Sequence, residues 1–283
     1  MRPALPATAL VLAAALWGLA WLPLRALHDI GMAGWPLAFI AFGTAGGCLL
    51  PLLLRQRAQW RADRRWLLLI ALLGGWANLA FTTAMIHGEV VRVMALFYLL
   101  PAWGAIGGRL FLGEQIDAAR IACVIAALSG AALILGAEAL LTLRVHWTDL
   151  LAISCGLAFT GNNLVFRARQ GAPVASKSAA MLLGTAALAA LALLALSPTT
   201  TPPSAAAMAG AAGYGLWALL ATTGMQFGVT HMAAARASIL IIFELIVAVL
   251  SAVLLGEDEL SAREAAGVAL VLLAAIIEAR RAT

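Results

Sequence analysis

Charged residues are scarce in this chain: only 11% of its 283 residues are Asp, Glu, Lys or Arg, whereas 64% are hydrophobic. A soluble domain could not cover its surface with so few polar groups. Polar stretches long enough to form a separate domain are also lacking, because apolar runs of about 20 residues recur along the chain. The sequence therefore predicts an all-α protein that crosses a membrane many times.

Cysteine is almost absent as well. The three cysteines, Cys48, Cys123 and Cys155, lie within apolar runs and lack the spacing typical of disulfide pairs or metal sites. We interpret them as packing residues. No other pattern in the sequence indicates a cofactor or a metal ion, so we expect the protein to use neither.

The apolar runs define ten predicted membrane helices, each about 30 Å long at a rise of about 1.5 Å per residue. They cover residues 5–24, 35–54, 66–86, 90–110, 118–137, 147–167, 178–196, 205–229, 236–255 and 262–279. The first is rich in alanine like a signal peptide, but nine further segments follow it, and we expect a permanent helix.

The placement of Lys and Arg gives the predicted topology. If the N-terminus is cytoplasmic, fourteen of the 18 basic residues fall on the inner side. Only Arg25, Arg92, Arg144 and Arg263 fall outside. This bias follows the positive-inside rule and places both termini in the cytoplasm. The basic residues therefore orient the protein, and we expect no nucleic-acid partner.

A unit of five segments occurs twice, which indicates an internal duplication. The matches are Ala95–Glu114 on Ser238–Glu257 at an offset of 143 residues, Thr82-Thr83-x-Met85 on Thr222-Thr223-x-Met225, and Gly18-Leu19-Ala20-Trp21 on Gly156-Leu157-Ala158-Phe159. Because five is odd, the second copy must be inverted in the membrane. The predicted repeats are residues 1–138 and 147–283. This organisation is typical of small-molecule transporters.

Some residues have simple structural explanations. Trp35, Trp60, Trp66 and Trp147 lie at segment ends, where indole rings favour the headgroup region. The pairs Gly43/Gly47 and Gly104/Gly108 have the spacing that lets two helices approach closely. We expect anchoring from the former and helix packing from the latter.

Polar residues at membrane depth are the candidate site residues, because each is unfavourable there without a partner or an aqueous cavity. Asn78 and Thr82 are four residues apart and share a helix face. Tyr98 lies one turn before Pro101, whose ring leaves the carbonyl of Phe97 without its helical hydrogen bond. These two segments thus offer an amide, two hydroxyls and a free carbonyl.

Further candidates come from the second half and from the first segment. Asn162 and Asn163 lie about 100° apart on their helix, so we expect one to line a cavity and the other to hold a helix contact. Aromatic walls are predicted from four residues, which are Trp17, Trp21, Tyr214 and Trp217. Packing alone is an equally good explanation for any single one of these rings.

Glu244 is the only acidic residue placed well inside a predicted helix, at the repeat position that Pro101 holds in the first half. It is a candidate to bind a substrate ammonium or to carry a proton, and the alternative is a structural hydrogen bond between helices. No Lys or Arg is predicted at mid-depth, which disfavours anionic substrates.

Each half closes on an apolar run followed by Gly-Glu, in Leu112-Gly113-Glu114 and Leu255-Gly256-Glu257. We expect these acids to be structural or gating residues. Each would cap the N-terminus of the following helix or pair with Arg120 or Arg263.

With ten helices in two five-helix halves that end in these motifs, the chain resembles the EamA-type members of the drug/metabolite transporter superfamily. The length and aromatic residues are most similar to those of YddG-type aromatic amino-acid exporters. The resemblance implies a central cavity lined mainly by helices one, three, four, six, eight and nine, and alternating access by rocking of the halves. Pro101 matches a proline common in this helix of each repeat, whereas Glu244 departs from it.

We weighed two other classes of function. A hydrolase would need a nucleophile and a base, but Ser129-Gly130 lacks the leading glycine of the usual serine motif and has no histidine beside it. A channel would need a charged ring or a carbonyl filter, and neither is visible. We therefore expect a transporter and not an enzyme.

The resulting hypothesis is an exporter of aromatic or other large neutral amino acids in a bacterial inner membrane, functional as a monomer in the lipid bilayer. Other drugs or metabolites, or a channel-like facilitator, are the alternatives. The predicted substrate-binding residues are Asn78, Thr82, Tyr98, Asn162, Asn163, Tyr214, Trp217, Trp17, Trp21 and Glu244. Neither the direction of transport nor proton coupling follows from the residues themselves.

Overall fold

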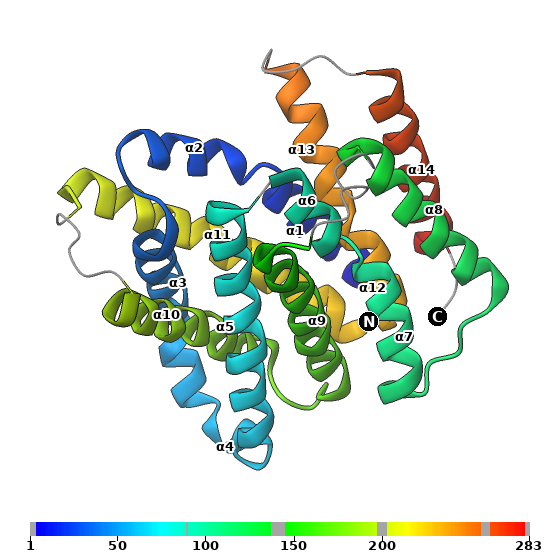
Figure 1. The fold of residues 1–283 in the computed structure, drawn as a ribbon. Helices are drawn as coiled ribbons and strands as arrows, with labels where there is room; N and C mark the ends of the chain where they lie inside the picture. The colour runs from blue at the N-terminus through cyan, green and yellow to red at the C-terminus, as the bar shows by residue number, and fades with distance from the viewer. Residues whose placement is uncertain (1–3, 89, 137–144, 197–202, 256–260, 281–283) are drawn as a thin grey trace.

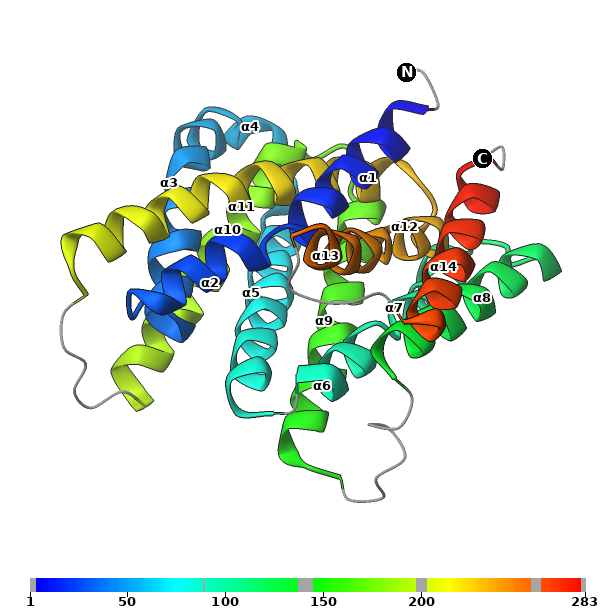
Figure 2. The ribbon, with the colours of Figure 1, turned by 90° about the horizontal axis from the view of Figure 1, so that it is seen from above.

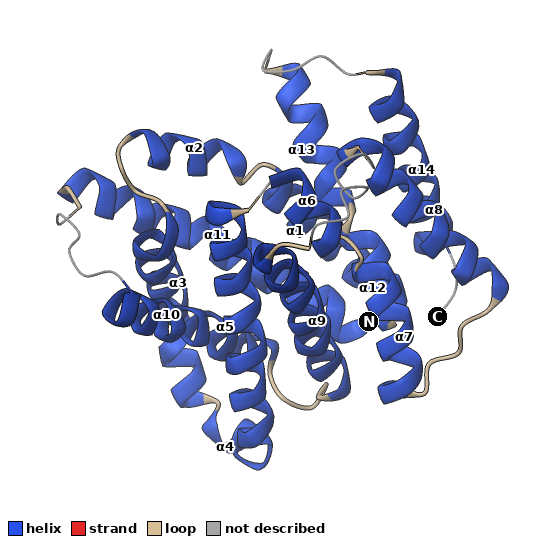
Figure 3. Ribbon diagram, viewed as in Figure 1, coloured by secondary structure: helices blue, strands red, loops and turns tan. Residues whose placement is uncertain are grey.

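The computed structural model describes residues 4–280 except 89, 137–144, 197–202 and 256–260. Within these residues the chain consists of helices joined by short loops and turns, with no strand (Figure 3). This confirms the predicted all-α class. Apolar composition over runs of 20 residues favours helices in a membrane, because a helix satisfies all its own backbone hydrogen bonds.

The first half of the chain contains nine of the helical elements. They are α1 (Ala4–Gly18), α2 (Trp21–Asp29), α3 (Gly34–Arg55), α4 (Arg57–Trp60), the 3-10 turn η1 (Arg61–Asp63), α5 (Arg64–His87), α6 (Val90–Phe97), α7 (Leu100–Leu112) and α8 (Ala118–Leu135). The second half contains the remainder. They are α9 (Trp147–Ala168), α10 (Val174–Leu196), α11 (Ala205–His231), α12 (Ala234–Ile241), α13 (Phe243–Leu254) and α14 (Ala262–Arg280).

Nine helices or helix pairs among the described residues are long and apolar enough to cross a bilayer, from 5–29 to 234–254. They correspond to the first nine predicted segments, with ends that differ by up to five residues except in the third, which begins at residue 57 and not at 66. The tenth predicted segment forms the helix α14 but is not among these nine apolar spans. Its 19 residues include four charged ones near the ends, Arg263, Glu264, Glu278 and Arg280.

Three of the spanning segments are interrupted. The first is broken between α1 and α2 at Leu19 and Ala20, and the fourth between α6 and α7 at Tyr98 and Leu99. The ninth is broken between α12 and α13 at Ile242. Pro101 explains the second break, because it lacks a backbone N–H and fits only the first turn of the new helix α7.

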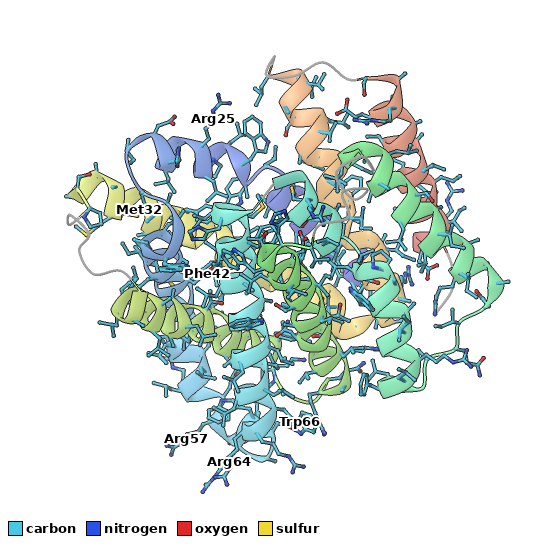
Figure 4. The ribbon with its side chains drawn as sticks, in the orientation of Figure 1. Arg25, Met32, Phe42, Arg57, Arg64 and Trp66 are labelled. Atoms are coloured by element: carbon cyan, nitrogen blue, oxygen red, sulfur yellow. The ribbon has the colours of Figure 1, made fainter. Side chains whose placement is uncertain are left out.

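The views agree with the predicted alternation of sides. In Figure 1, α4, the loop after α7 and the loop after α9 lie in the lower part of the molecule, whereas α2 and the upper end of α13 lie at the top. Figure 4 shows Arg57 and Arg64 at the lower end and Arg25 at the opposite end. Hereafter the lower end is called the basic end and the upper end the opposite end.

Helices from the two halves pack in matched pairs. α3 packs on α10 and α8 on α14, and each of these pairs is unchanged when the halves are exchanged. α7 packs on α12 as well. The contact of α1 with α11 corresponds to that of α9 with α5 when the halves are exchanged, and α3 with α11 corresponds to α10 with α5. Figure 2 shows α1, α12 and α13 close together beside α9. This pairing is what two related units would produce, and the boundaries 1–138 and 147–283 stay a prediction.

Glycines permit the closest helix contacts. A side chain on Gly104 would overlap Ser238, and one on Gly108 would press against Ala234, so this pair brings α7 onto α12 as expected. The pair Gly43/Gly47 differs from the prediction. The close contact is at Gly46, which faces Leu183 of α10, whereas Gly47 has no atom within 4 Å of a Cβ position.

The tryptophans at segment ends hold those ends in place. The indole N–H of Trp35 donates to the Thr83 hydroxyl at 3.0 Å, and that of Trp60 donates to the Leu53 carbonyl at 2.8 Å. Two arginines lie over the Trp66 ring, and Arg169 is the closer at 4.1 Å from the centroid. Cys123 and Cys155 are buried in apolar clusters, whereas Cys48 is exposed.

Candidate functional site

A hydrogen bond joins two of the broken segments at the centre of the molecule. The Tyr98 hydroxyl donates to Glu244 Oε1 at 2.6 Å. Tyr98 lies in the break between α6 and α7, and Glu244 is the second residue of α13, directly after the break at Ile242. This bond is the structural hydrogen bond between helices that the sequence analysis gave as the alternative for Glu244, and it joins the two halves of the chain. A role of Glu244 in binding a substrate ammonium or a proton stays a prediction.

The surroundings of this pair are aromatic. The Phe97 ring contacts the rings of Phe81, Tyr98 and Phe159, with centroid distances of 5.1, 5.4 and 5.9 Å. Phe81, Phe97, Tyr98 and Phe159 are called the central aromatic cluster below. Tyr98 is 2% exposed, whereas the three phenylalanines and Glu244 are half-buried. Glu244 is therefore partly accessible, and its carboxylate is bonded to the end residue of the aromatic cluster, Tyr98.

The first segment reaches the same centre. A Cβ on Gly18, at the end of α1, would overlap the backbone carbonyl of Glu244 and the side chain of Val247. Only glycine lets α1 approach α13 this closely. Trp17 packs against the same hydrophobic core as Phe97. Three helix breaks thus converge near the Tyr98–Glu244 pair.

Aromatic residues of α1, α2 and α11 form a second group. Tyr214 is buried in a cluster against which Trp17 and Trp217 pack. The Trp217 indole N–H donates to the Leu16 carbonyl at 3.1 Å. Trp21 lies across the break from Trp17, and its indole donates to Ser251 of α13 at 3.0 Å. The structure thus brings Trp17, Tyr214 and Trp217 together, whereas Trp21 holds α2 to α13.

Asn78 and Thr82 lie on one face of α5, as predicted. The Asn78 amide donates to the Thr185 hydroxyl of α10 at 2.9 Å, and the Thr82 hydroxyl donates to the Asn78 backbone carbonyl at 2.8 Å. Both side chains are half-buried. The amide is therefore engaged in a helix contact in this conformation.

Asn162 and Asn163 belong to a buried amide cluster. The expectation that they would separate is not what the structure shows: the Asn162 amide donates to Asn163 Oδ1 at 3.2 Å. Gln226 of α11 donates to the same oxygen at 3.2 Å, and Asn162 and Gln226 are 0% and 1% exposed. Because α9 packs against α5, α7 and α11, its residues 162–166 are all buried. Asn163 therefore holds α9 to α11, whereas Asn162 contacts Met181 of α10.

At the basic end, Glu114 connects the two halves. Its carboxylate accepts from the backbone N–H of Ala234, the first residue of α12, at 2.9 and 3.1 Å, and lies 3.6 Å from Arg167 Nε. The expectation that Glu114 caps the following helix α8 or pairs with Arg120 is wrong. Asp117 caps α8, and Arg120 pairs with the buried Glu278 at 3.0 Å. The second motif acid, Glu257, lies outside the described residues.

Lys177 reinforces the same end. Its ammonium donates to the Phe166 and Arg169 carbonyls at 2.8 and 3.0 Å and to the Thr230 hydroxyl at 3.2 Å. The side chain is 0% exposed. Lys177 thereby occupies the carbonyl end of α9, where a helix leaves acceptors unpaired, and joins it to α10 and α11.

At the opposite end, one ion pair joins the starts of α6 and α9. Arg92 Nε donates to Asp149 Oδ1 at 2.7 Å and its Nη2 to Oδ2 at 2.8 Å, in the two-pronged geometry that suits a guanidinium. The residues are 9% and 3% exposed. Asp149 also accepts from the backbone N–H of His146, so it fixes the start of α9.

Several residues that contact the predicted site residues were not themselves predicted. Phe81, Phe97 and Phe159 line the centre, and Gln226 completes the amide cluster. Phe159 aligns with Trp21 in the repeated motif, which could have indicated it. Trp103 Nε1 is buried in α7 and has no hydrogen-bond partner among the described residues. It lies near Gly156 and the Phe97 carbonyl.

Comparison with known proteins supports the class of membrane transporter. Residues 5–136 match the EamA-like transporter family. A crystal structure of a protein with 20% sequence identity aligns over 98% of this chain and 99% of the other, with a TM-score of 0.80. At that identity the likeness concerns the fold. A search of curated proteins found no match.

The fold and the family match define a multi-span membrane transporter. The match to the EamA-like transporter family covers residues 5–136 and therefore the first half of the chain.

Proposed function

We propose that the protein carries small organic solutes with an amine and an apolar or aromatic body, and that aromatic and other large neutral amino acids are among them. The observation that supports this most is the Tyr98–Glu244 hydrogen bond, which places a carboxylate beside the central aromatic cluster where broken helices meet. Irregular backbone at membrane depth is tolerated where it lines a cavity, and transporters use such breaks to bind their cargo.

The remaining predicted residues extend this site. Trp17, Tyr214 and Trp217 supply apolar surface next to the break in the first segment. Asn78 and Thr82 supply half-buried polar groups on α5. Asn162 and Asn163 contribute through helix contacts in this conformation, and direct contact with a solute requires α9 and α11 to separate.

An alternating mechanism is supported by unequal packing at the two ends. At the basic end α7 packs on α12, and Glu114 bonds to Ala234. Exchange of the halves would pair α6 with α13 at the opposite end, and these two are not among the closely packed helices of the described chain. The basic end is thus the closed one. Rocking of the halves would exchange these arrangements.

We also propose export from the cytoplasm across a bacterial inner membrane, with both termini inside. The basic residues of α4 and α5, among them Arg57 and Arg64, support this orientation. The chain contains both halves, so a monomer is sufficient to enclose a site. The direction of transport rests on the family resemblance.

Counterflow in proteoliposomes tests the proposal. Vesicles loaded with unlabelled tryptophan or phenylalanine are expected to take up the labelled amino acid in a saturable manner. Threonine, a sugar and a cationic drug serve as competitors. Inhibition by the drug alone would favour the drug-exporter alternative, non-saturable flux would favour a channel-like facilitator, and no flux from folded protein would contradict the proposal.

A further inference from the structure

We infer that this site recognises its cargo through the ammonium group and leaves a cargo carboxylate without a counter-charge, so that cationic aromatic amines bind more tightly than the corresponding amino acids. The inference rests on the proposed function and narrows its substrate class. It follows from the charges and backbone donors that the structure places near Glu244.

Glu244 has no basic partner in the described part of the chain. Its hydrogen bond is to the neutral Tyr98 hydroxyl, and none of the ion pairs involves it. A carboxylate in such a place is stabilised by a cation that arrives with the cargo. A primary ammonium supplies that charge and also three hydrogen-bond donors.

Basic residues that could neutralise a cargo carboxylate are engaged elsewhere. Lys177 donates to three oxygens at the end of α9, Arg92 is paired with Asp149, and Arg120 is paired with Glu278. All three lie at helix ends. The buried Arg236, in the first turn of α12, faces the charge of Glu278. Within the part of the chain that the structure describes, no ion pair supplies a fixed positive charge to Glu244.

The starts of α7 and α13, which follow the breaks at Tyr98 and Ile242, do not offer an anion site either. Such half-helix N-termini bind carboxylates in other transporters because their backbone N–H groups are free. At α13 that position is occupied by Glu244 itself. At α7 the second residue is Pro101, which has no N–H, and the Ala102 N–H is bonded to the Leu99 carbonyl.

The aromatic groups fit a cation. Rings within about 6 Å of an ammonium attract it through their negative faces, and more so away from water. The Phe97 ring contacts the rings of Tyr98 and Phe159, and Tyr98 is the hydrogen-bond partner of Glu244. The unpartnered indole N–H of Trp103 is a neutral donor, so it provides a hydrogen bond but no charge for a carboxylate.

Tyr98 has a defined part in this scheme. Its hydroxyl donates a hydrogen bond to Glu244 Oε1 at 2.6 Å. An arriving ammonium must displace or share that bond, so the hydroxyl competes with the cargo. Removing it frees the carboxylate and is expected to strengthen amine binding.

Binding of three indole compounds to the full-length protein in nanodiscs separates the possibilities. Tryptamine carries only the amine, tryptophan carries both charges, and indole-3-propionate carries only the carboxylate. We expect tryptamine to displace labelled tryptamine with a Kd at least tenfold lower than that of tryptophan, and indole-3-propionate not to compete. Tryptophan binding as tightly as tryptamine, or no tryptamine binding to folded protein, would overturn the inference.

Variants test the residues. Glu244→Gln is expected to weaken tryptamine at least tenfold, and Tyr98→Phe to tighten it several-fold. Glu264→Gln is the matched control, because Glu264 takes part in the cap at the start of α14 and not in the site. Tryptamine binding is expected to be unchanged in this variant. If Glu244→Gln does not fold, the sign of the Tyr98→Phe effect decides, since weaker or unchanged binding contradicts the inference. Tryptophan counterflow without a preference for tryptamine contradicts this inference alone, whereas absence of any counterflow contradicts the proposed function as well.

Discussion

Glu114 at the end of the first half caps the start of α12 in the second half, with both carboxylate oxygens within 3.1 Å of the Ala234 backbone N–H. Gly113, which precedes it, has φ +67, a left-handed conformation that glycine adopts without strain. This turn directs the carboxylate away from its own following helix and toward α12. The Gly-Glu motif thus fastens one half of the molecule to the other.

Replacing Glu114 with Ala is expected to destabilise the protein and to loosen the basic end. The change removes a helix cap worth about 1 kcal/mol and the attraction to Arg167, for a total of about 1–2 kcal/mol. Thermal unfolding in detergent measures the first effect. Labelling of a cysteine introduced at Ser238, which faces Gly104 in the contact of α7 with α12, measures the second and is expected to become faster.

The control for this change is Glu264→Ala. Glu264 accepts from the backbone N–H of Ser261 within its own half, so it is also a capping acid but joins no two halves. Labelling at the basic end should not change in this variant. Equal acceleration in both variants would mean that Glu114 has no special part in closing that end.

The sequence allowed the helices and their order to be predicted because membrane spans are defined by long apolar runs. It also indicated that Pro101 leaves the Phe97 carbonyl without its helical hydrogen bond, but it predicted one continuous segment where the structure has α6 and α7. The break at Ile242 has no proline to reveal it. It is visible in the sequence only through the alignment of Glu244 with Pro101, which shows equivalence but not conformation.

The contacts of the site residues were less predictable. Glu114 and Ala234 are separated by 120 residues, and their contact depends on how α7 and α12 pack. The 100° separation of Asn162 and Asn163 would divide them on a helix with one buried face. α9 is enclosed on several sides near its end, so both side chains point into protein. Spacing along one helix does not reveal how many neighbours surround it.

Lys177→Met is expected to be one of the most damaging changes in the chain. It leaves the Phe166 and Arg169 carbonyls and the Thr230 hydroxyl without their donor. Unpaired buried polar groups cost about 1–3 kcal/mol each before relaxation, so a loss of about 3 kcal/mol or more is expected. Loss of folded protein in size-exclusion chromatography, or a lowered Tm, provides the measurement.

Arg64→Gln, an exposed change at the same end of the molecule, serves as the comparison. Substitutions of this kind generally alter stability by less than about 0.5 kcal/mol. A Lys177→Met protein that unfolds at the same temperature as Arg64→Gln would show that the three acceptors find other partners.

Mutations of Arg92 and Asp149 are expected to have strongly non-additive effects on stability. Arg92→Met or Asp149→Leu alone leaves one buried charge without its partner, which costs about 3–5 kcal/mol. The double variant removes both charges and is expected to recover much of this loss. Stability of the two single variants and the double variant, measured by thermal unfolding, gives the coupling. Losses that simply add would indicate that the pair is not coupled in the folded protein.

A glycine substitution tests the packing of α10 on α5. A Cβ on Gly184 would overlap the backbone carbonyl of Ala71, which cannot move aside without shifting α5. Gly184→Ala is therefore expected to destabilise the protein by about 1–3 kcal/mol through overpacking. Gly47→Ala is the matched control, because nothing lies within 4 Å of its Cβ position and alanine favours a helix by about 1 kcal/mol over glycine. The Tm should fall in the first variant and stay the same or rise slightly in the second. A reversed order would show that α10 does not approach α5 at Gly184.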